Sequence, residues 1–331
     1  MTTLLLILKG IVETYMSSRG LICFANPQGQ DVHVDSALTN VSVKYQNADL
    51  VGDKIFPVIS VKKDSDLYFK YGKQDFRIYD DLRAPGARAK RFEWKIEKSL
   101  PYALREHSLE EQLVDETRDN CDDPIKYDAD STELVTNALM LRVESDVAVM
   151  ANDISNYASG HYQTPTLAWD RANSIPLDDI DNAKEIVRQK IFRKPNTLVV
   201  SEATHKVLRK HPQLLDLFKY TKGGTLQVDQ LKSAFEVQNY VVYGAGVLTS
   251  SEGQAETFGQ LWGKNAALLY VSPTPGLKQI SFAYIFRKTG YRLVERWRED
   301  STRSDWIRVS DKYEINLISN VAGDLITGAI S

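Results

Sequence analysis

The sequence predicts an α+β fold with helices in the middle of the chain, strands gathered toward its carboxyl-terminal end, and a long β ribbon that projects from the body. Three observations carry this prediction. Residues 90–104 alternate between apolar and polar side chains, which is the period of a strand. Residues 131–151 carry an apolar stripe at helical spacing. From residue 281 onward, strand-like segments follow one another with short turns between them.

The composition is that of a soluble globular protein, and 331 residues suffice for one large domain or two to three smaller ones. The net charge of −3 argues against a protein that holds nucleic acid by bulk charge, because such proteins are usually far more basic.

The two cysteines, Cys23 and Cys121, are too few for a disulfide framework, which favours synthesis in a reducing cytoplasm. The apolar residues 4–8 are too short for a signal peptide or a membrane span, and we expect a buried or arm-like segment there.

The first part of the chain, residues 1–55, shows no sustained periodicity and is predicted to be an extended arm with short structured pieces. Residues 56–71 and 90–104 are predicted to form the two strands of the ribbon. In the second of these strands Phe92, Trp94 and Ile96 fall on one side and charged residues on the other, so the ribbon has one apolar face.

The ribbon's tip is the stretch DDLRAPGARAKRFEW, residues 80–94, in which Pro85 and Gly86 shape a turn. This tip is basic, and its cations are Arg83, Arg88, Lys90 and Arg91. Nothing in the stretch can hold a small-molecule substrate alone, which indicates that its ligand is another macromolecular surface.

An acidic run follows the ribbon, with only Arg118 and Lys126 opposing its carboxylates. The acids between residues 106 and 133 are Glu106, Glu110, Glu111, Asp115, Glu116, Asp119, Asp122, Asp123, Asp128, Asp130 and Glu133. The clearest helix is predicted at 131–151, where the stripe consists of Val135, Leu139, Val143, Val147 and Met150. Asp130 is its expected N-cap, with Glu133 three residues on as in a capping box.

The middle of the chain mixes helices and strands. Helices are predicted at 180–192 and 228–237, and a third begins after the cap Ser201 and ends before Pro212. The expected strands are 196–201, 239–250, 266–272, 281–286, 291–299, 305–310 and 312–319, with a turn at 298–305. No internal repeat is visible, so repeat architectures do not apply.

The glycine-rich sites of nucleotide-binding proteins are incomplete here. Gly244 and Gly246 follow a strand as in a dinucleotide loop, but the third glycine and the following amphipathic helix are missing. Gly263 and Lys264 lack the preceding glycine of a P-loop. Turns are therefore expected at both places.

Metal-binding and catalytic patterns are also incomplete. None of the five histidines forms an i, i+4 zinc pair, and we expect His205 and His211 on the surface of one helix. The acids Asp122, Asp123, Asp128 and Asp130 lack the central Gly and the final Glu of a calcium loop. We assign no catalytic, cofactor-binding or metal-binding residue, and we expect a protein that is not an enzyme.

The order of these parts resembles the major capsid protein of tailed bacteriophages, which has the HK97-like fold. The run NADLVGDKIFPVISVKKDSDLYFKYGK (47–73) resembles the passage from arm to extended loop, and DSTELVTNALMLRVESDVAVMAN (130–152) resembles the spine helix. PNTLVVSEATHKVLRKHPQLLDLFKYT (195–221) resembles the axial domain, and RVSDKYEINLISNVAGDLITGAI (308–330) the carboxyl-terminal end. The similarity covers nearly all of residues 40–331.

The resemblance implies a shell protein that assembles into hexamers and pentamers of an icosahedral head enclosing double-stranded DNA. It divides the chain into an arm (1–55), an extended loop (56–105), a peripheral domain (106–184 and 281–314) and an axial domain (185–280 and 315–331). The implied partners are further copies of the chain, a scaffolding protein, a portal and a decoration protein. The implied location is the virion, with assembly in the host cytoplasm.

We expect the basic tip to lie on the acidic run of an adjacent copy, because opposite patches steer association and set register. The acids in this contact are Asp115, Glu116, Asp119, Asp122 and Asp123, and the apolar ribbon face of Phe92, Trp94 and Ile96 is expected to be buried against the neighbour. A merely solvated loop tip is the alternative.

Two other functions stay open for the protein as a whole. One is an encapsulin-type compartment that holds cargo enzymes, and the other is an α+β enzyme with a scattered active site.

Overall fold

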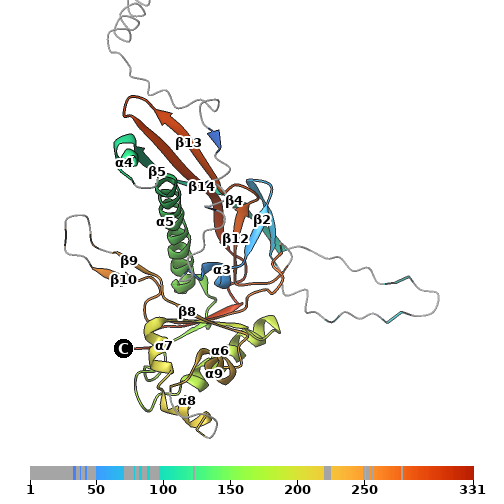
Figure 1. Cartoon of the computed structure of the whole chain (residues 1–331). Coiled ribbons are helices and arrows are strands. Elements are labelled where there is room, and N and C mark those ends of the chain that lie inside the picture. The colour runs from blue at the N-terminus through green and yellow to red at the C-terminus, as the bar shows by residue number, and fades with distance from the viewer. Residues whose placement is uncertain are drawn as a thin grey trace, which may run out of the picture.

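The computed structural model describes residues 33–34, 38, 42, 50–70, 78, 82–83, 88–89, 97–121, 124–219, 225–248, 250, 254, 257–276 and 279–331. Its architecture mixes helices with two large sheets, as the sequence predicts (Figure 1). The two sheets lie at opposite ends of an elongated body, and a long central helix connects them (Figure 1).

The six-stranded sheet forms the upper part of the body in Figure 1. Its strands lie in the order β1 (His33–Val34), β13 (Leu293–Glu299), β14 (Ser304–Leu317), β12 (Ala283–Lys288) and β2 (Val58–Val61), and β5 (Arg105–Val114) also pairs with β14. The single strand β14 replaces the two strands expected at 305–310 and 312–319. The intervening Asp311 does not interrupt it, because its buried carboxylate is paired with Arg287 and Arg292.

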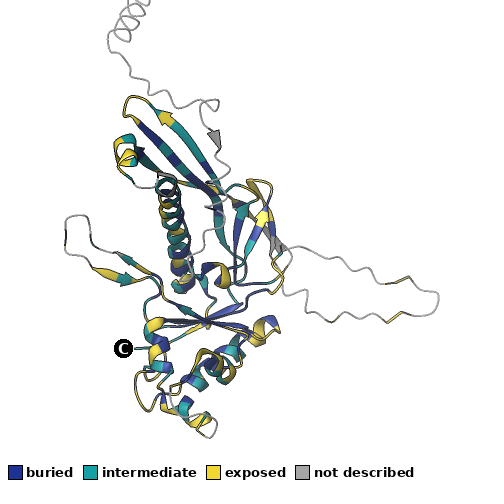
Figure 2. Cartoon of the chain, in the orientation of Figure 1, coloured by how far each residue is buried: buried dark blue, intermediate teal, exposed yellow. Residues whose placement is uncertain are grey.

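The long helix α5 (Pro124–Asn152) packs along this sheet. The predicted stripe is confirmed at Val135, Leu139, Val143 and Val147, which are all buried, and Figure 2 shows the buried side of the helix turned toward the sheet. The expected N-cap was wrong, because Asp130 lies inside the helix. Proline is compatible with a first turn, where its missing N–H needs no partner, so the helix already begins at Pro124.

The five-stranded sheet forms the lower part of the body. Its strands lie in the order β6 (Tyr162–Gln163), β15 (Gly323–Ile326), β11 (Ala266–Leu269), β7 (Thr197–Ser201) and β8 (Asn239–Tyr243). Successive residues of β7 belong to different cores: Val199 packs with the end of α5, and Leu198 and Val200 pack with the helices below. This sheet is therefore buried on both faces, which explains its continuous apolar strands (Figure 2).

Three helices lie against the lower sheet, α6 (Pro176–Ile191), α7 (Glu202–Leu208) and α9 (Val228–Ala234), and α8 (Pro212–Leu217) packs against α6 and α9. The predicted cap is confirmed, since the Ser201 hydroxyl accepts a hydrogen bond from the Thr204 N–H at 3.2 Å. Pro212 does more than end α7. It stands in the first turn of α8, and His211 caps that helix.

The remaining elements are short: α3 (Gly52–Ile55), β3 (Ser65–Lys70), β4 (Glu97–Ala103), α4 (Asp115–Asp119), a 3-10 turn (Ile154–Asn156), β9 (Gly246–Leu248) and β10 (Phe258–Gln260). The strand expected at 239–250 is divided in two, because Gly244 and Ala245 turn the chain between β8 and β9. β9 then pairs with β10 as a separate two-stranded hairpin.

Candidate assembly surfaces

The base of the ribbon is an antiparallel pair of strands, β3 and β4, that is anchored on the body by aromatic packing. The Tyr102 ring stacks on Phe286 at 4.9 Å between centroids, and Tyr68 lies 5.5 Å from the same ring. The Tyr68 hydroxyl donates a hydrogen bond to the Leu317 carbonyl at 3.1 Å, and burial raises the pKa of this phenol to about 12. The direction in which the ribbon leaves the body is thus fixed by its base.

The last described pair of residues in the base of the ribbon is Lys70 with Glu97. The predicted contact residues of the loop lie between these two positions in the sequence. Arg83 and Arg88 are both exposed. Two apolar side chains accompany them, since Ile78 is 97% exposed and Leu82 is 82% exposed. The other predicted contact residues, Lys90, Arg91, Phe92, Trp94 and Ile96, lie outside the described residues.

The acidic run folds into strand β5 and helix α4, and much of its charge is neutralised within the subunit. The carboxylate of Asp115 accepts two hydrogen bonds from the Arg298 guanidinium, each 2.5 Å long, which lower the pKa of this acid. Glu110 accepts a single hydrogen bond, from Arg308 Nε at 2.7 Å. The sequence analysis missed both arginines because they belong to strands near the other end of the chain.

Two of the predicted contact acids remain available on α4. Glu116 and Asp119 are exposed, and neither forms an ion pair within the described part of the subunit. Asp122 and Asp123 lie outside the described residues. Of the predicted contact acids that the structure describes, Glu116 and Asp119 on α4 are therefore the ones that remain open to a neighbour.

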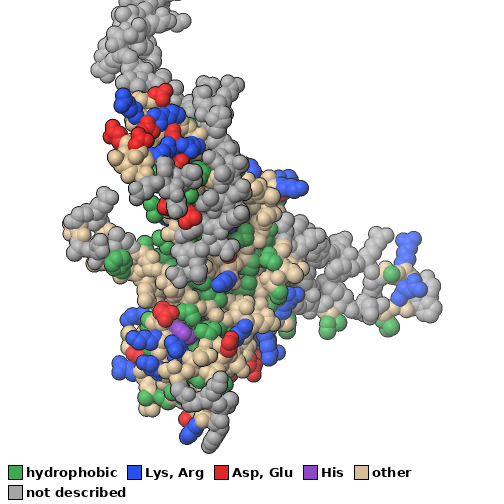
Figure 3. Space-filling view, in the orientation of Figure 1, with side chains coloured by type: hydrophobic (Ala, Val, Ile, Leu, Met, Phe, Trp, Pro, Cys, Tyr) green, Lys and Arg blue, Asp and Glu red, His purple; other side chains and the backbone are tan. Residues whose placement is uncertain are grey.

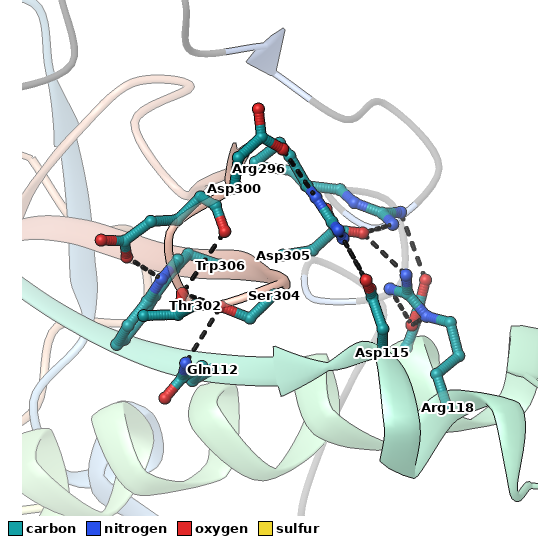
Figure 4. Close-up of polar contacts among 12 residues, drawn as sticks. Gln112, Asp115, Arg118, Arg296, Asp300, Thr302, Ser304, Asp305 and Trp306 are labelled. Atoms are coloured by element: carbon teal, nitrogen blue, oxygen red, sulfur yellow. Dashed lines mark hydrogen bonds and ion pairs between the residues drawn. The ribbon is translucent and has the colours of Figure 1, made fainter.

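A closed ring of four charges fixes α4 and α5 against the sheet. Arg118 contacts Asp305 and Asp128 at 2.7 Å each, and Arg296 contacts the same two carboxylates at 2.5 and 3.2 Å. The four side chains converge from α4, α5, β13 and β14, as the labelled Arg118, Arg296 and Asp305 show in Figure 4. Burial raises the pKa of Asp305, but the hydrogen bonds from both arginines more than offset it and hold this pKa below its ordinary value.

The outer face of the six-stranded sheet carries a cross-strand tryptophan pair that the sequence analysis did not single out. Trp297 and Trp306 are directly opposite in the β13–β14 register, and their rings stack at 6.3 Å with an interplanar angle of 6°. The Arg308 guanidinium lies 4.7 Å from the centre of the Trp297 ring. The Trp306 indole donates to Glu299 at 2.7 Å. Both tryptophans are half-buried, a combination of residue types that is enriched in the energetic centres of protein interfaces.

The described residues of the chain that leads into the ribbon contact α5 along much of its length. Leu38 packs in the cluster of Val135 and Leu139, and the Ser42 hydroxyl accepts from Thr136 at 2.8 Å. Farther along the helix, the buried Glu144 carboxylate accepts hydrogen bonds from two backbone N–H groups at the start of α3. Burial raises the pKa of Glu144, and the backbone hydrogen bonds act in the opposite direction.

The histidine prediction was wrong for both residues named. His205 is buried, with Nδ1 3.0 Å from the Tyr240 hydroxyl, and His211 is buried, with Nε2 2.9 Å from the Ser174 hydroxyl. Burial lowers the pKa of both side chains. The helical spacing that suggested a surface location could not reveal that β8 and the segment before α6 cover these positions.

Within the described ranges, no group of three or more His, Cys, Asp or Glu side chains is placed to hold a metal ion. The helices of that same part of the chain include none with the length and apolar character of a membrane span.

Comparison with known proteins gives consistent results, although no protein-family model matches the chain. The Major capsid protein of Burkholderia phage BcepMu is 33% identical over 302 residues, which cover 89% of this chain and 96% of that protein. The Major capsid protein of Pseudomonas phage JBD67 is 25% identical over 244 residues, covering 72% of this chain and 77% of the relative.

Solved structures of phage proteins have the same fold as this chain. The crystal structure of a phage-related protein from Bordetella bronchiseptica RB50 has a TM-score of 0.74 and 31% identity, covering 89% of this chain and 97% of that one. The mature capsid of bacteriophage PhiM1 has the same fold, with a TM-score of 0.51, 12% identity and coverage of 81% and 84%.

Proposed function

The chain belongs to the family of bacteriophage major capsid proteins, and we propose that its copies form the hexamers and pentamers of an icosahedral phage head. The observation that carries this proposal is the 33% identity to a Major capsid protein along 96% of that relative's length. The fold is the HK97-like fold that the sequence resemblance predicted. Electron microscopy of the purified chain tests the proposal, because a shell protein forms capsomers or closed particles.

The two alternatives left open by the sequence receive less support. Both curated relatives are named as phage major capsid proteins, which favours a phage head over a compartment for cargo enzymes. The same relatives favour a structural role over catalysis.

We propose that the shell is a component of the virion, assembled in the host cytoplasm, and that it encloses double-stranded DNA. A net charge of −3 suits this role, since a subunit with a large excess of Lys and Arg would retain the DNA by counterion release during packaging. A scaffolding protein, a portal and a decoration protein are the further partners that we propose. The division of the chain into arm, extended loop, peripheral domain and axial domain belongs to the same proposal.

We propose that the basic loop tip of one copy contacts α4 of the next. Arg83 and Arg88 are exposed, and so are Glu116 and Asp119, which lack an ion pair within the described subunit. Asp115 has a different role, because Arg298 of its own chain already neutralises it. Lys90 and Arg91 strengthen the positive side of this contact. Such a heterologous contact forms a ring of subunits when the rotation between neighbouring copies closes, as it does in a hexamer or pentamer.

Apolar contacts supply most of the affinity in this proposal, since exposed charge pairs contribute little. The ribbon face of Phe92, Trp94 and Ile96 is one such contact. The half-buried pair Trp297 and Trp306, on the outer face of the sheet, is a second surface that we assign to a neighbouring copy.

A further inference from the structure

An open groove of about 480 Å³ lies on the lower part of the body, away from the surfaces assigned to assembly. One wall is the segment around Arg171 that precedes α6, and the other is the end of α7 with the start of α8. Lys206 and Lys210 project from that second wall, with Val207 between them. The groove's size is in the range of small-ligand sites rather than of a protein interface.

The three cations of the groove are not held in hydrogen bonds or ion pairs by the described residues, although Arg171 is close enough to Asp170 to interact with it electrostatically. Arg171, Lys206 and Lys210 are exposed, and none of them makes a side-chain hydrogen bond or ion pair with the described residues. Asp170 is the one carboxylate of the lining, and it accepts a hydrogen bond from the Ser331 hydroxyl. Three cations and one carboxylate leave the groove positive on a chain whose net charge is −3.

This arrangement differs from that of the cations at the opposite end of the body. There Arg118, Arg296, Arg298 and Arg308 each contact at least one carboxylate of the same chain. Figure 3 shows Lys and Arg side chains gathered over the region of α7 in the lower part of this face. The cations of the groove thus differ from these four arginines, which are neutralised by carboxylates of their own chain.

The buried His211 lines the groove without adding charge. Its Nδ1 accepts a hydrogen bond from the Gln213 N–H at 3.3 Å, so the ring proton is on Nε2, 2.9 Å from the Ser174 hydroxyl. Both ring nitrogens are thus occupied by the cap of α8 and by Ser174. The charge that a ligand meets comes from Arg171, Lys206 and Lys210.

We propose that this groove binds phosphate groups. A guanidinium matches two phosphate oxygens at once, and two ammonium groups neutralise the remaining charge of a doubly charged anion. An acidic peptide offers only single charges on flexible side chains, so it suits the small groove less well. The phosphate can come from a small molecule such as a nucleotide or from the backbone of DNA, and the chemistry of recognition is the same.

The test uses the full-length protein and measures the binding of pyrophosphate, ATP and a short DNA duplex by isothermal titration calorimetry. The triple variant Arg171→Gln, Lys206→Gln, Lys210→Gln removes the charges at exposed positions. Lys190→Gln is the matched control, because Lys190 is exposed on α6 outside the groove. We expect affinity to fall about tenfold for each groove cation removed, and to stay unchanged in the control.

The probes also identify the source of the phosphate. Tighter binding of the duplex, with an affinity that falls steeply as salt rises, assigns the groove to the DNA backbone. Binding of ATP at least as tight as that of the duplex assigns it to small molecules. Three results overturn the proposal: no binding of any phosphate probe, equal binding by the triple variant and the unmodified protein, or equal competition by a glutamate-rich peptide.

Discussion

The buried carboxylate of Glu144 and the backbone of Gly52 are in direct contact, with Oε2 2.8 Å from the Gly52 N–H. The other carboxylate oxygen accepts from the Val51 N–H at 2.9 Å. A methyl group on Gly52 would lie 2.7 Å from Oε2, so a larger residue at this position would require the carboxylate to shift out of this contact. One side chain of the central helix thereby fixes the point at which the chain enters the base of the ribbon.

We therefore predict that Gly52→Ala destabilises the subunit by about 2 kcal/mol, because the carboxylate must move away and leave buried N–H groups unpaired. Urea unfolding of the unassembled subunit measures the change. Gly244→Ala is the control, since nothing lies within 4 Å of a methyl group there. Equal stability of the two variants would refute the proposed role of this contact.

The ring of charges around Asp305 leads to a second prediction. Arg118→Gln should lower the free energy of unfolding by about 2–3 kcal/mol at pH 7, because Asp128 then keeps only Arg296, and Asp305 keeps Arg296 and the more distant Arg298 at 3.5 Å. The pKa of Asp305 is depressed in the folded state, so this stabilisation is present above the unfolded pKa and is lost as the pH falls through the folded pKa. Thermal unfolding from pH 7 down to pH 2 should show the variant and the unmodified subunit converging at the acid end, below the ordinary pKa of an aspartate. A constant difference across that range would show that packing, not charge, is responsible.

The contribution of Asp324 to the stability of the fold depends on pH in the direction opposite to that of Asp305. This carboxyl is fully buried in β15, neither oxygen has a hydrogen-bond partner in the described structure, and burial raises its pKa from 3.8 to about 7. The folded state therefore holds a proton that the unfolded state has lost, and the contribution of Asp324 to stability is lost as the pH rises from about 4 to about 7, by up to about 4 kcal/mol.

Asp324→Asn should accordingly be more stable than the unmodified subunit at pH 8 and should show a flatter pH profile. Denaturant unfolding between pH 5 and pH 8 measures both effects. The exposed Asp216→Asn serves as control and should leave the slope unchanged. A parallel pH profile for Asp324→Asn and the unmodified subunit would mean that Asp324 is not protonated in the folded state.

The proposed contact between the loop tip and α4 is tested by exchanging charges. Arg83→Glu with Arg88→Glu should slow assembly, as should Glu116→Lys with Asp119→Lys, and the effect should shrink as salt screens the charges. Light scattering during assembly measures the rate. Combining both pairs in one chain should restore assembly, because the contact joins two copies of the same sequence. If the combined variant assembles no better than either pair alone, the two surfaces do not meet.

Sequence periodicity predicted the elements whose signal is local. The stripe at Val135, Leu139, Val143 and Val147 indicates both a helix and its buried side, and Ser201 indicates a helix start. Asp130 misled because acids inside the first turns of a helix resemble a cap, whereas Pro124, directly after Asp123 in the sequence, was a helix-start signal that the sequence analysis did not use.

The charge network was not predictable in the same way. In the sequence, only Arg118 and Lys126 oppose the acidic run at residues 106–133, yet Asp115 is neutralised by Arg298, which is 183 residues away and is brought near by the sheet of β5, β14 and β13. The burial of His205 likewise depends on Tyr240 from another strand. Contacts between distant parts of the chain thus determine both the pairing of the acidic run and the burial of His205. The periodicity of a single sequence carries no signal for such contacts.

The central claim, that this chain builds a phage shell, is tested most directly by electron microscopy of the purified full-length protein across a range of salt concentrations. The account predicts hexameric and pentameric capsomers, tubes or closed icosahedral particles, with neighbouring copies in heterologous contact. A compact monomer that forms no higher assembly at any salt concentration would contradict it.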